Sequence, residues 1–384
     1  MRKHSRIFNV SLRYPCLILV VGFGLMAIVA TGGGGSGGTP APAEQNAITS
    51  SNAPQVASAV GNMMAGVEAT LFAITLDVGS GSYCPKTLLE HADDLLEYKG
   101  DTVSKPGIQK RLSATASETE NCRDGGSVTT VMTWDGPVVP TDCSQIENPA
   151  LEFIFAYCQE DPESMNGSIG ISYIGDLCME SPPEFSMSFN EFTYQNQDDN
   201  CDFTFDLTME FGDIQYDAYD YMIGMSLAID GTLEGTFDGD SLDIAYDDWT
   251  MTLSDISYNA SDEITGVYLS LDGAFSGTID GDPFDESYED LVLRLEYTTI
   301  GFVSGTSLRV NGSYNGACLA DWITIETLEP IFIPDSSGSP TSGRIRLSGN
   351  GGATIVFESD GSITITVDGE QLRYADYDDL PSCI

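Results

Sequence analysis

The feature that most constrains the fold is an alternation of apolar and polar side chains with a period near two, which begins at about residue 121. Runs such as "CDFTFDLTMEF", "WTMTLSDISY" and "GSITITV" show it, and short clusters of Gly, Asp, Asn and Pro separate them. This pattern is typical of half-buried β-strands joined by tight turns. Because no helical spacers interrupt the runs, we expect consecutive strands to pair as one long antiparallel meander.

One unit of the alternating region occurs twice. Residues 227–253 and 269–295 match at an offset of 42 residues, so that "LAIDGTLEGTFDGD" returns as "LSLDGAFSGTIDGD". Each copy predicts a β-hairpin with an Asp-Gly turn. Glycines of each copy fall on the same strand face as the large apolar residues: Gly231 and Gly235, then Gly273 and Gly277. Glycine inside a strand costs stability, so we expect either sharp curvature or the close approach of another backbone at this face.

Two helices are expected before the strands. Val56, Val60 and Met63 recur at helical spacing and predict a helix over 54–77, and a second apolar face predicts a helix over 85–100. The first helix is rich in small residues and would fit against the glycine-bearing face. The predicted fold class is mainly β with two N-terminal helices, in which a long antiparallel meander forms a strongly curved sheet or partial barrel over a helix.

The chain divides into four segments by composition. Residues 1–31 place basic residues before the apolar run "YPCLILVVGFGLMAIVA", which predicts a signal peptide or a signal anchor. Residues 32–52 are rich in Gly, Ser, Pro and Ala and predict a tether. We expect a helical segment over 53–120 that packs on the sheet, and the antiparallel β domain over 121–384.

The N-terminus resembles that of Gram-negative lipoprotein-type exported envelope proteins, in which a signal ending in small residues leads into a run of glycines. In that class a lipobox cysteine precedes the glycines and carries the acyl chain, whereas Thr31 holds this position here and Cys16 lies at the front of the apolar run. The resemblance implies an exported protein of the periplasm, outer membrane or cell surface of a Gram-negative-type bacterium, with a membrane tether at the N-terminus. The β-rich remainder resembles uncharacterised envelope proteins.

Charge and cysteine content narrow the function further. The chain has 15 Lys and Arg against 59 Asp and Glu, a formal net charge of -44, which argues against nucleic acid and anionic lipid as partners. Cysteines in an exported chain predict disulfides, and no CxxC or Cys/His cluster suggests a zinc site. The pairing is open, and the candidates after the signal are Cys84, Cys122, Cys143, Cys158, Cys178, Cys201, Cys318 and Cys383.

The two DGD turns support two interpretations. Asp-Gly at a strand end is a hairpin signal, which needs no ligand. The carboxylates could also gather around one calcium ion, although neither copy has the spacing of a twelve-residue calcium loop. The candidate ligands are Asp238, Asp240 and Asp243 in the first copy and Asp280, Asp282 and Asp285 in the second. We therefore expect plain turns, with weak calcium binding as the second hypothesis and no other cofactor.

No catalytic centre is predicted. The chain has 2 histidines, of which His91 alone lies beyond the signal, and it lacks the GxSxG, HExxH and P-loop motifs. We expect a structural or binding role without catalysis, with an envelope protein or a glycan as partner. The alternative is a periplasmic carrier that holds a hydrophobic ligand in a groove of the curved sheet. The two differ in whether the glycine-bearing face is filled or hollow.

Overall fold

The protein is mainly β, as the alternation predicts. The computed structural model describes residues 47–61, 63–64, 112–137, 145–175, 184–197, 200–219, 221–237, 239–261, 264–316, 319, 321–337, 339–376 and 379–381. The predicted helix over 85–100, the signal and residues 32–46 of the tether lie outside these residues.

The strands follow one another with tight turns between them. In chain order they are β1 (Ala47–Ile48), β2 (Leu112–Asn121), β3 (Gly125–Gly136), β4 (Glu147–Glu160), β5 (Glu163–Ile174), β6 (Glu184–Asn196), β7 (Cys201–Tyr216), β8 (Met222–Phe237), β9 (Asp240–Tyr258), β10 (Ile264–Ile279), β11 (Asp282–Ile300), β12 (Val303–Asn315), β13 (Ile323–Pro334), β14 (Ser342–Phe357), β15 (Ile363–Val367) and β16 (Glu370–Tyr374).

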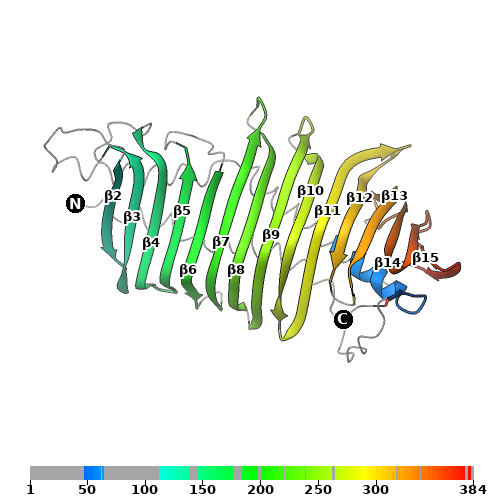
Figure 1. Ribbon diagram of the computed structural model, residues 1–384, viewed down its shortest axis with the longest axis horizontal. Coiled ribbons are helices and arrows are strands. Elements are labelled where there is room, and N and C mark those ends of the chain that lie inside the picture. Colours follow the sequence, from blue (N-terminus) through cyan, green and yellow to red (C-terminus); the bar gives the residue numbers. More distant parts are fainter. Residues whose placement is uncertain are drawn as a thin grey trace.

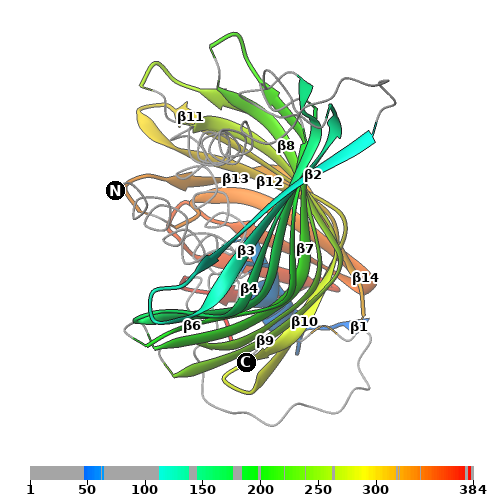
Figure 2. The same ribbon diagram turned by 90° about the vertical axis from the view of Figure 1, so that its left-hand side faces the viewer.

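All the strands belong to one sheet, and the predicted antiparallel meander is confirmed. From β2 to β16 each strand pairs with the next in the chain, whereas β1 pairs in parallel with β14. The strands therefore stand in chain order along the long axis of the molecule (Figure 1). The sheet is open, because β2 and β16 end its path and no pairing joins them in the described part of the chain. Figure 2, seen from the β2 end, shows the strands twisting and curving toward one side.

The doubled unit forms two consecutive hairpins. Residues 227–253 lie on β8 and β9, and residues 269–295 lie on β10 and β11. The two-residue turns are closed by the pairs Phe237–Asp240 and Ile279–Asp282. Apolar side chains of both hairpins share one face of the sheet, which we call the inward face, and Leu269 on that face is fully buried.

Gly231 and Gly273 of the repeat lie where their strands bulge against a neighbour. A Cβ atom on Gly273 would stand 2.7 Å from the Cα of Trp249 on β9, and one on Gly231 would stand 2.6 Å from the Cα of Leu207 on β7. The pairing register shifts at both glycines. The close approach of another backbone is thus confirmed, but the backbone is that of the adjacent strand. A helix that fills this space is not shown by the described residues.

These bulges form a line across the sheet. On several neighbouring strands a glycine with positive φ faces a non-glycine residue that also has positive φ. The pairs are Gly126 with Tyr157, Gly167 with Glu191, Gly273 with Asp248, and Gly312 with Asp290. A bulge bends its strand and increases the local twist. A row of them therefore bends the sheet along one crease, and this account needs no packed helix.

The described residues contain one short helix. It spans residues 53–64, with residue 62 undescribed, so the first predicted helix is present over part of its length and residues 65–77 lie outside the description. Its first backbone hydrogen bond runs from Val56 N to Asn52 O at 3.0 Å, and Asn52 Oδ1 accepts from Thr49 N at 2.7 Å in the preceding turn. Its buried residues, including Val60, belong to the same apolar cluster as the strands. Figure 1 places it beside β14, at a distance along the sheet from the repeated hairpins.

The inward face holds a row of aromatic rings across β9 to β12. Tyr246 lies 6.2 Å from Phe275, Phe275 lies 6.1 Å from Tyr288, and Tyr288 lies 5.8 Å from Tyr314. Tyr246 and Tyr288 occupy equivalent positions of the repeat, which explains why rings align from one hairpin to the next. Paired aromatic rings at such distances stabilise a core beyond the area that they bury.

Candidate functional site

The DGD turns have the geometry of plain hairpin turns. Asp280 and Gly281 have φ values of 54° and 83°, the pattern of a type I′ turn. The first turn includes Gly239 with φ of 100°, and its Asp238 is outside the described residues. The two turns are adjacent: Ser241 N donates to Asp280 Oδ1 at 2.8 Å, and Asp280 N donates to Ser241 O at 2.9 Å. One carboxylate oxygen of Asp280 therefore bonds the neighbouring turn.

The other candidate calcium ligands point to solvent. Asp240, Asp243, Asp282 and Asp285 are all exposed. Among the residues with described positions, the one group of three candidate metal ligands within 4.8 Å of each other is Cys122, Cys158 and Glu160. Its two sulfur atoms are bonded to each other, so they are not thiolate ligands. Weak calcium binding at the turns stays a prediction.

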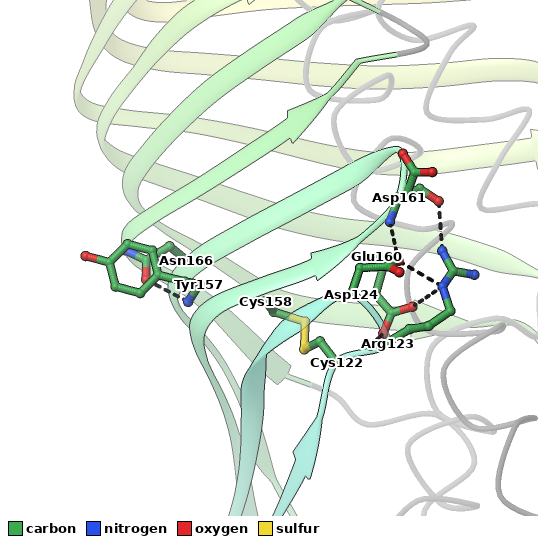
Figure 3. Close-up of a disulfide and its surroundings, with 8 residues drawn as sticks. All are labelled: Cys122, Arg123, Asp124, Tyr157, Cys158, Glu160, Asp161 and Asn166. Atoms are coloured by element: carbon green, nitrogen blue, oxygen red, sulfur yellow. Dashed lines mark hydrogen bonds and ion pairs between the residues drawn. A yellow bond between two sulfur atoms is a disulfide. The ribbon is translucent and has the colours of Figure 1, made fainter.

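One predicted disulfide is present. Cys122 and Cys158 are bonded across a sequence separation of 36 residues, with Cα atoms 5.4 Å apart. The bond joins the end of β2 to β4 (Figure 3). Cys201 is buried at the start of β7. The remaining candidates lie outside the described residues: Cys84, Cys143, Cys178, Cys318 and Cys383.

Charged groups reinforce the same corner of the sheet. Arg123 Nε lies 2.9 Å from Asp124 Oδ2, and Arg123 Nη2 donates to Asp161 O at 2.9 Å. The hydrogen bond from Arg123 lowers the pKa of the Asp124 carboxyl. Figure 3 shows Arg123 reaching from the β2–β3 turn to the β4–β5 turn. These groups are exposed, so the pairs add little stability in salt and serve mainly to fix the two turns.

The structure has a buried carboxylate that the sequence did not predict. Glu286 is 7% exposed and lies on the inward face of β11, next to Tyr288. Burial, and then the charge of Glu286, raises the pKa of Tyr288. The repeat could have indicated it, because the position equivalent to Glu286 in the first copy is Ile244, an apolar residue that is fully buried.

A shallow groove lies on the outward face of β3 to β6. Its volume is about 220 Å³ and its floor is made by small side chains, among them Ala150, Gly170 and Ser188. Ser172 Oγ and Ser186 Oγ bond each other at 2.7 Å within it. This volume is below the range of about 300–1,000 Å³ that is usual for small-molecule sites.

Several large exposed apolar side chains lie at one rim of the sheet. We call the rim formed by the β7–β8, β9–β10 and β11–β12 turns the upper rim, and the opposite one the lower rim; they are at the top and bottom of Figure 1. At or near the upper rim the exposed side chains are Tyr216, Tyr219, Tyr297, Ile300, Phe302 and Val303. The lower rim carries Phe237 and Trp322 among its exposed side chains, and acids at its described turns: Asp124, Asp161, Asp280, Asp321 and Asp360.

The β11–β12 turn is the most exposed apolar feature. Phe302 is 105% exposed, and its neighbours Ile300 and Val303 are 57% and 44% exposed. Gly301 has φ of 68°, which suits the first central position of a type II′ turn. We call residues 300–303 the apolar tip. Its signal in the sequence is a Gly-X turn between apolar residues inside a stretch, 297–308, that has no charged side chain.

Comparison with known proteins gives no relative. No protein-family model, curated protein or solved structure matches the chain. A search of the described residues for long apolar helices found none that could cross a membrane.

Proposed function

We propose that this protein is an exported, acidic, disulfide-bonded protein of the cell envelope or cell surface of a Gram-negative-type bacterium, with a binding or structural role and no catalysis. The observation that carries the binding role is the separation of its apolar residues into two sets. One set is buried on the inward face, and the other is exposed toward the edges of the sheet, most strongly at the apolar tip. Exposed apolar groups of this kind mark interaction sites.

Export is supported by the basic and apolar leader and by the disulfide. Disulfides form and persist in oxidising compartments and are rare in the cytosol. The excess of acidic residues keeps such a protein soluble and repels anionic partners. These arguments favour a partner that is neutral or basic, such as an envelope protein or a glycan at that location.

The carrier hypothesis has weaker support. A carrier would present the inward face to a ligand, yet Leu233, Leu269 and Leu271 on this face are at most 5% exposed. Side chains that are already covered have no apolar surface left to offer. We therefore rank binding at the rim above carriage of a hydrophobic ligand.

Thiol trapping in the native host, combined with cell fractionation, tests the proposal. Free thiols are alkylated during lysis, and the peptides that contain Cys122 and Cys158 are identified by mass spectrometry. We expect the two peptides to be joined by a disulfide and the protein to be found in the envelope or medium. Alkylated Cys122 and Cys158 in a cytosolic fraction would refute export.

A further inference from the structure

We propose that the apolar tip, Ile300–Val303, inserts into the surface of a lipid bilayer whose headgroups carry no net charge. This deepens the proposed function, since it names the partner of the exposed rim. The tip is the end of the β11–β12 hairpin, and Figure 1 shows this hairpin extending to the upper rim. Phe302 has the largest exposed fraction of the large apolar side chains in the described chain, and Ile300 and Val303 beside it are also exposed.

The backbone of the tip is already hydrogen-bonded. Ile300 pairs with Val303 across the two-residue turn, and Thr299 pairs with Ser304 one step further from the end. Peptide groups that enter the apolar part of a membrane must have their hydrogen bonds satisfied internally. A closed hairpin meets this condition, so only the turn itself remains to be solvated by the headgroup region.

Polar side chains below the tip are paired with one another. Thr299 Oγ1 and Ser304 Oγ are 3.1 Å apart, and Tyr297 Oη donates to Asp335 Oδ2 at 2.7 Å. A protein partner is normally recognised with about one hydrogen bond per 100–200 Å² of interface. A tip with apolar side chains at its end and few polar groups to offer suits lipid better than such a partner.

The charge distribution selects the kind of lipid. Residues 297–308 carry no charge, so the tip itself can leave water without burying an ion. The whole chain has a formal net charge of -44, which opposes approach to an anionic surface. Tyr297 is 50% exposed just behind the tip, and tyrosine favours the boundary between headgroups and acyl chains. A zwitterionic surface fits all three facts.

A tryptophan placed at the tip reports on insertion of the tip itself, whether or not the N-terminal apolar run also binds lipid. We would prepare the full chain as Phe302→Trp and add phosphatidylcholine vesicles whose acyl chains are brominated. The emission of the unsubstituted chain, which has 3 tryptophans, is subtracted. The matched control is Phe237→Trp, since Phe237 is a 53% exposed phenylalanine beside a two-residue turn of the lower rim.

We expect the added emission of the Phe302→Trp chain to shift to shorter wavelength and to be quenched, and that of the Phe237→Trp chain to be unaffected. Combining Ile300→Ser with Phe302→Trp should raise the lipid concentration for half-maximal quenching about tenfold, the factor for losing one buried aliphatic side chain. At low salt, vesicles that contain anionic phosphatidylglycerol should quench this emission less than phosphatidylcholine vesicles do, because the acidic chain is repelled.

Two results would overturn the proposal. One is that vesicles leave the added tryptophan emission of the Phe302→Trp chain unchanged. The tip would then not bind lipid, even if an envelope protein binds it. The other is equal quenching in the Phe302→Trp and Phe237→Trp chains, which would mean that the protein binds lipid without using the tip. Neither would refute export, because that is decided by the thiols at Cys122 and Cys158.

Discussion

The line of bulges makes a quantitative prediction for single glycines of the β10–β11 hairpin. Gly273 has φ of 94°, and a Cβ there would stand 2.7 Å from Trp249 Cα. Gly281 has a similar φ of 83°, but a Cβ there would meet nothing within 4 Å. Gly277 has no positive φ, yet its Cβ would stand 3.0 Å from Ile244 Cα and closer still to Asp243 O. The three sites thus separate backbone strain from steric overlap.

Alanine at each site should cost a different amount of stability. Holding a non-glycine residue at positive φ costs about 1–3 kcal/mol, which is the whole effect expected for Gly281→Ala. Overpacking typically costs about 1–3 kcal/mol, and this is the effect expected for Gly277→Ala. Gly273→Ala combines both, so we expect a loss of about 2–6 kcal/mol.

Urea unfolding of the oxidised protein, followed by far-ultraviolet circular dichroism, measures these losses. The order of midpoints should be unsubstituted chain, then Gly281→Ala and Gly277→Ala, then Gly273→Ala. A Gly273→Ala midpoint equal to that of Gly281→Ala would show that the neighbouring backbone does not press on Gly273. The assignment of the inward glycines to strand-to-strand contact would then be wrong.

Four further predictions follow from the same description. Reducing Cys122–Cys158, or replacing both with Ser, should lower the free energy of unfolding by about 4 kcal/mol for a separation of 36 residues, as measured in urea with and without reductant. Burial raises the pKa of Tyr246 and of Tyr288. Both hydroxyls therefore stay neutral in the folded protein above about pH 10, where they ionise in the unfolded chain, and the free energy of unfolding falls as the pH rises further. Above pH 10 the free energy of unfolding should fall less steeply with pH in Tyr246→Phe, by about 1.4 kcal/mol per pH unit, and urea unfolding across this pH range would show it. Glu286→Ile, which copies the first repeat, should raise stability by about 1–3 kcal/mol, and a lower melting temperature would instead show that the carboxylate stabilises the fold. Millimolar calcium should bind weakly or not at all at the DGD turns, so a calorimetric titration with strong heat would contradict the plain-turn interpretation.

Most of the fold could be predicted from the repeat and from the alternation of apolar and polar residues. Period two, Asp-Gly turns and the absence of helical spacers were enough to predict an antiparallel meander and to place residues 227–253 and 269–295 on consecutive hairpins. These signals are local, and each strand pairs with its neighbour in the chain. The prediction therefore required no knowledge of long-range contacts.

The glycines show what local patterns could not supply. Placing Gly231 and Gly273 on the inward face required only alternation, but identifying what approaches them required the pairing register. A bulge changes that register by one residue, and its position depends on both strands. The helix was assigned to this space because a small-residue helix was available, whereas Figure 1 places helix 53–64 beside β14.

The apolar tip and Glu286 were missed for different reasons. Ile300 is the last residue of β11 and Phe302 lies in the turn, so both are exposed because the turn at Gly301 puts them at the edge of the sheet. Glu286 is one acid among 59, and only the comparison with Ile244 in the first copy marks it as inward. The disulfide pairing was likewise open, because it depends on which strands are neighbours in space.

The most direct test of the central claim is whether the inward face is filled by the chain itself. The protein purified from its native host would be extracted with organic solvent, and the extract quantified by mass spectrometry against the amount of protein. We expect no stoichiometric lipid, because residues such as Leu269 and Leu293 are at most 1% exposed. One lipid molecule per chain, retained through purification, would contradict the account and favour the carrier.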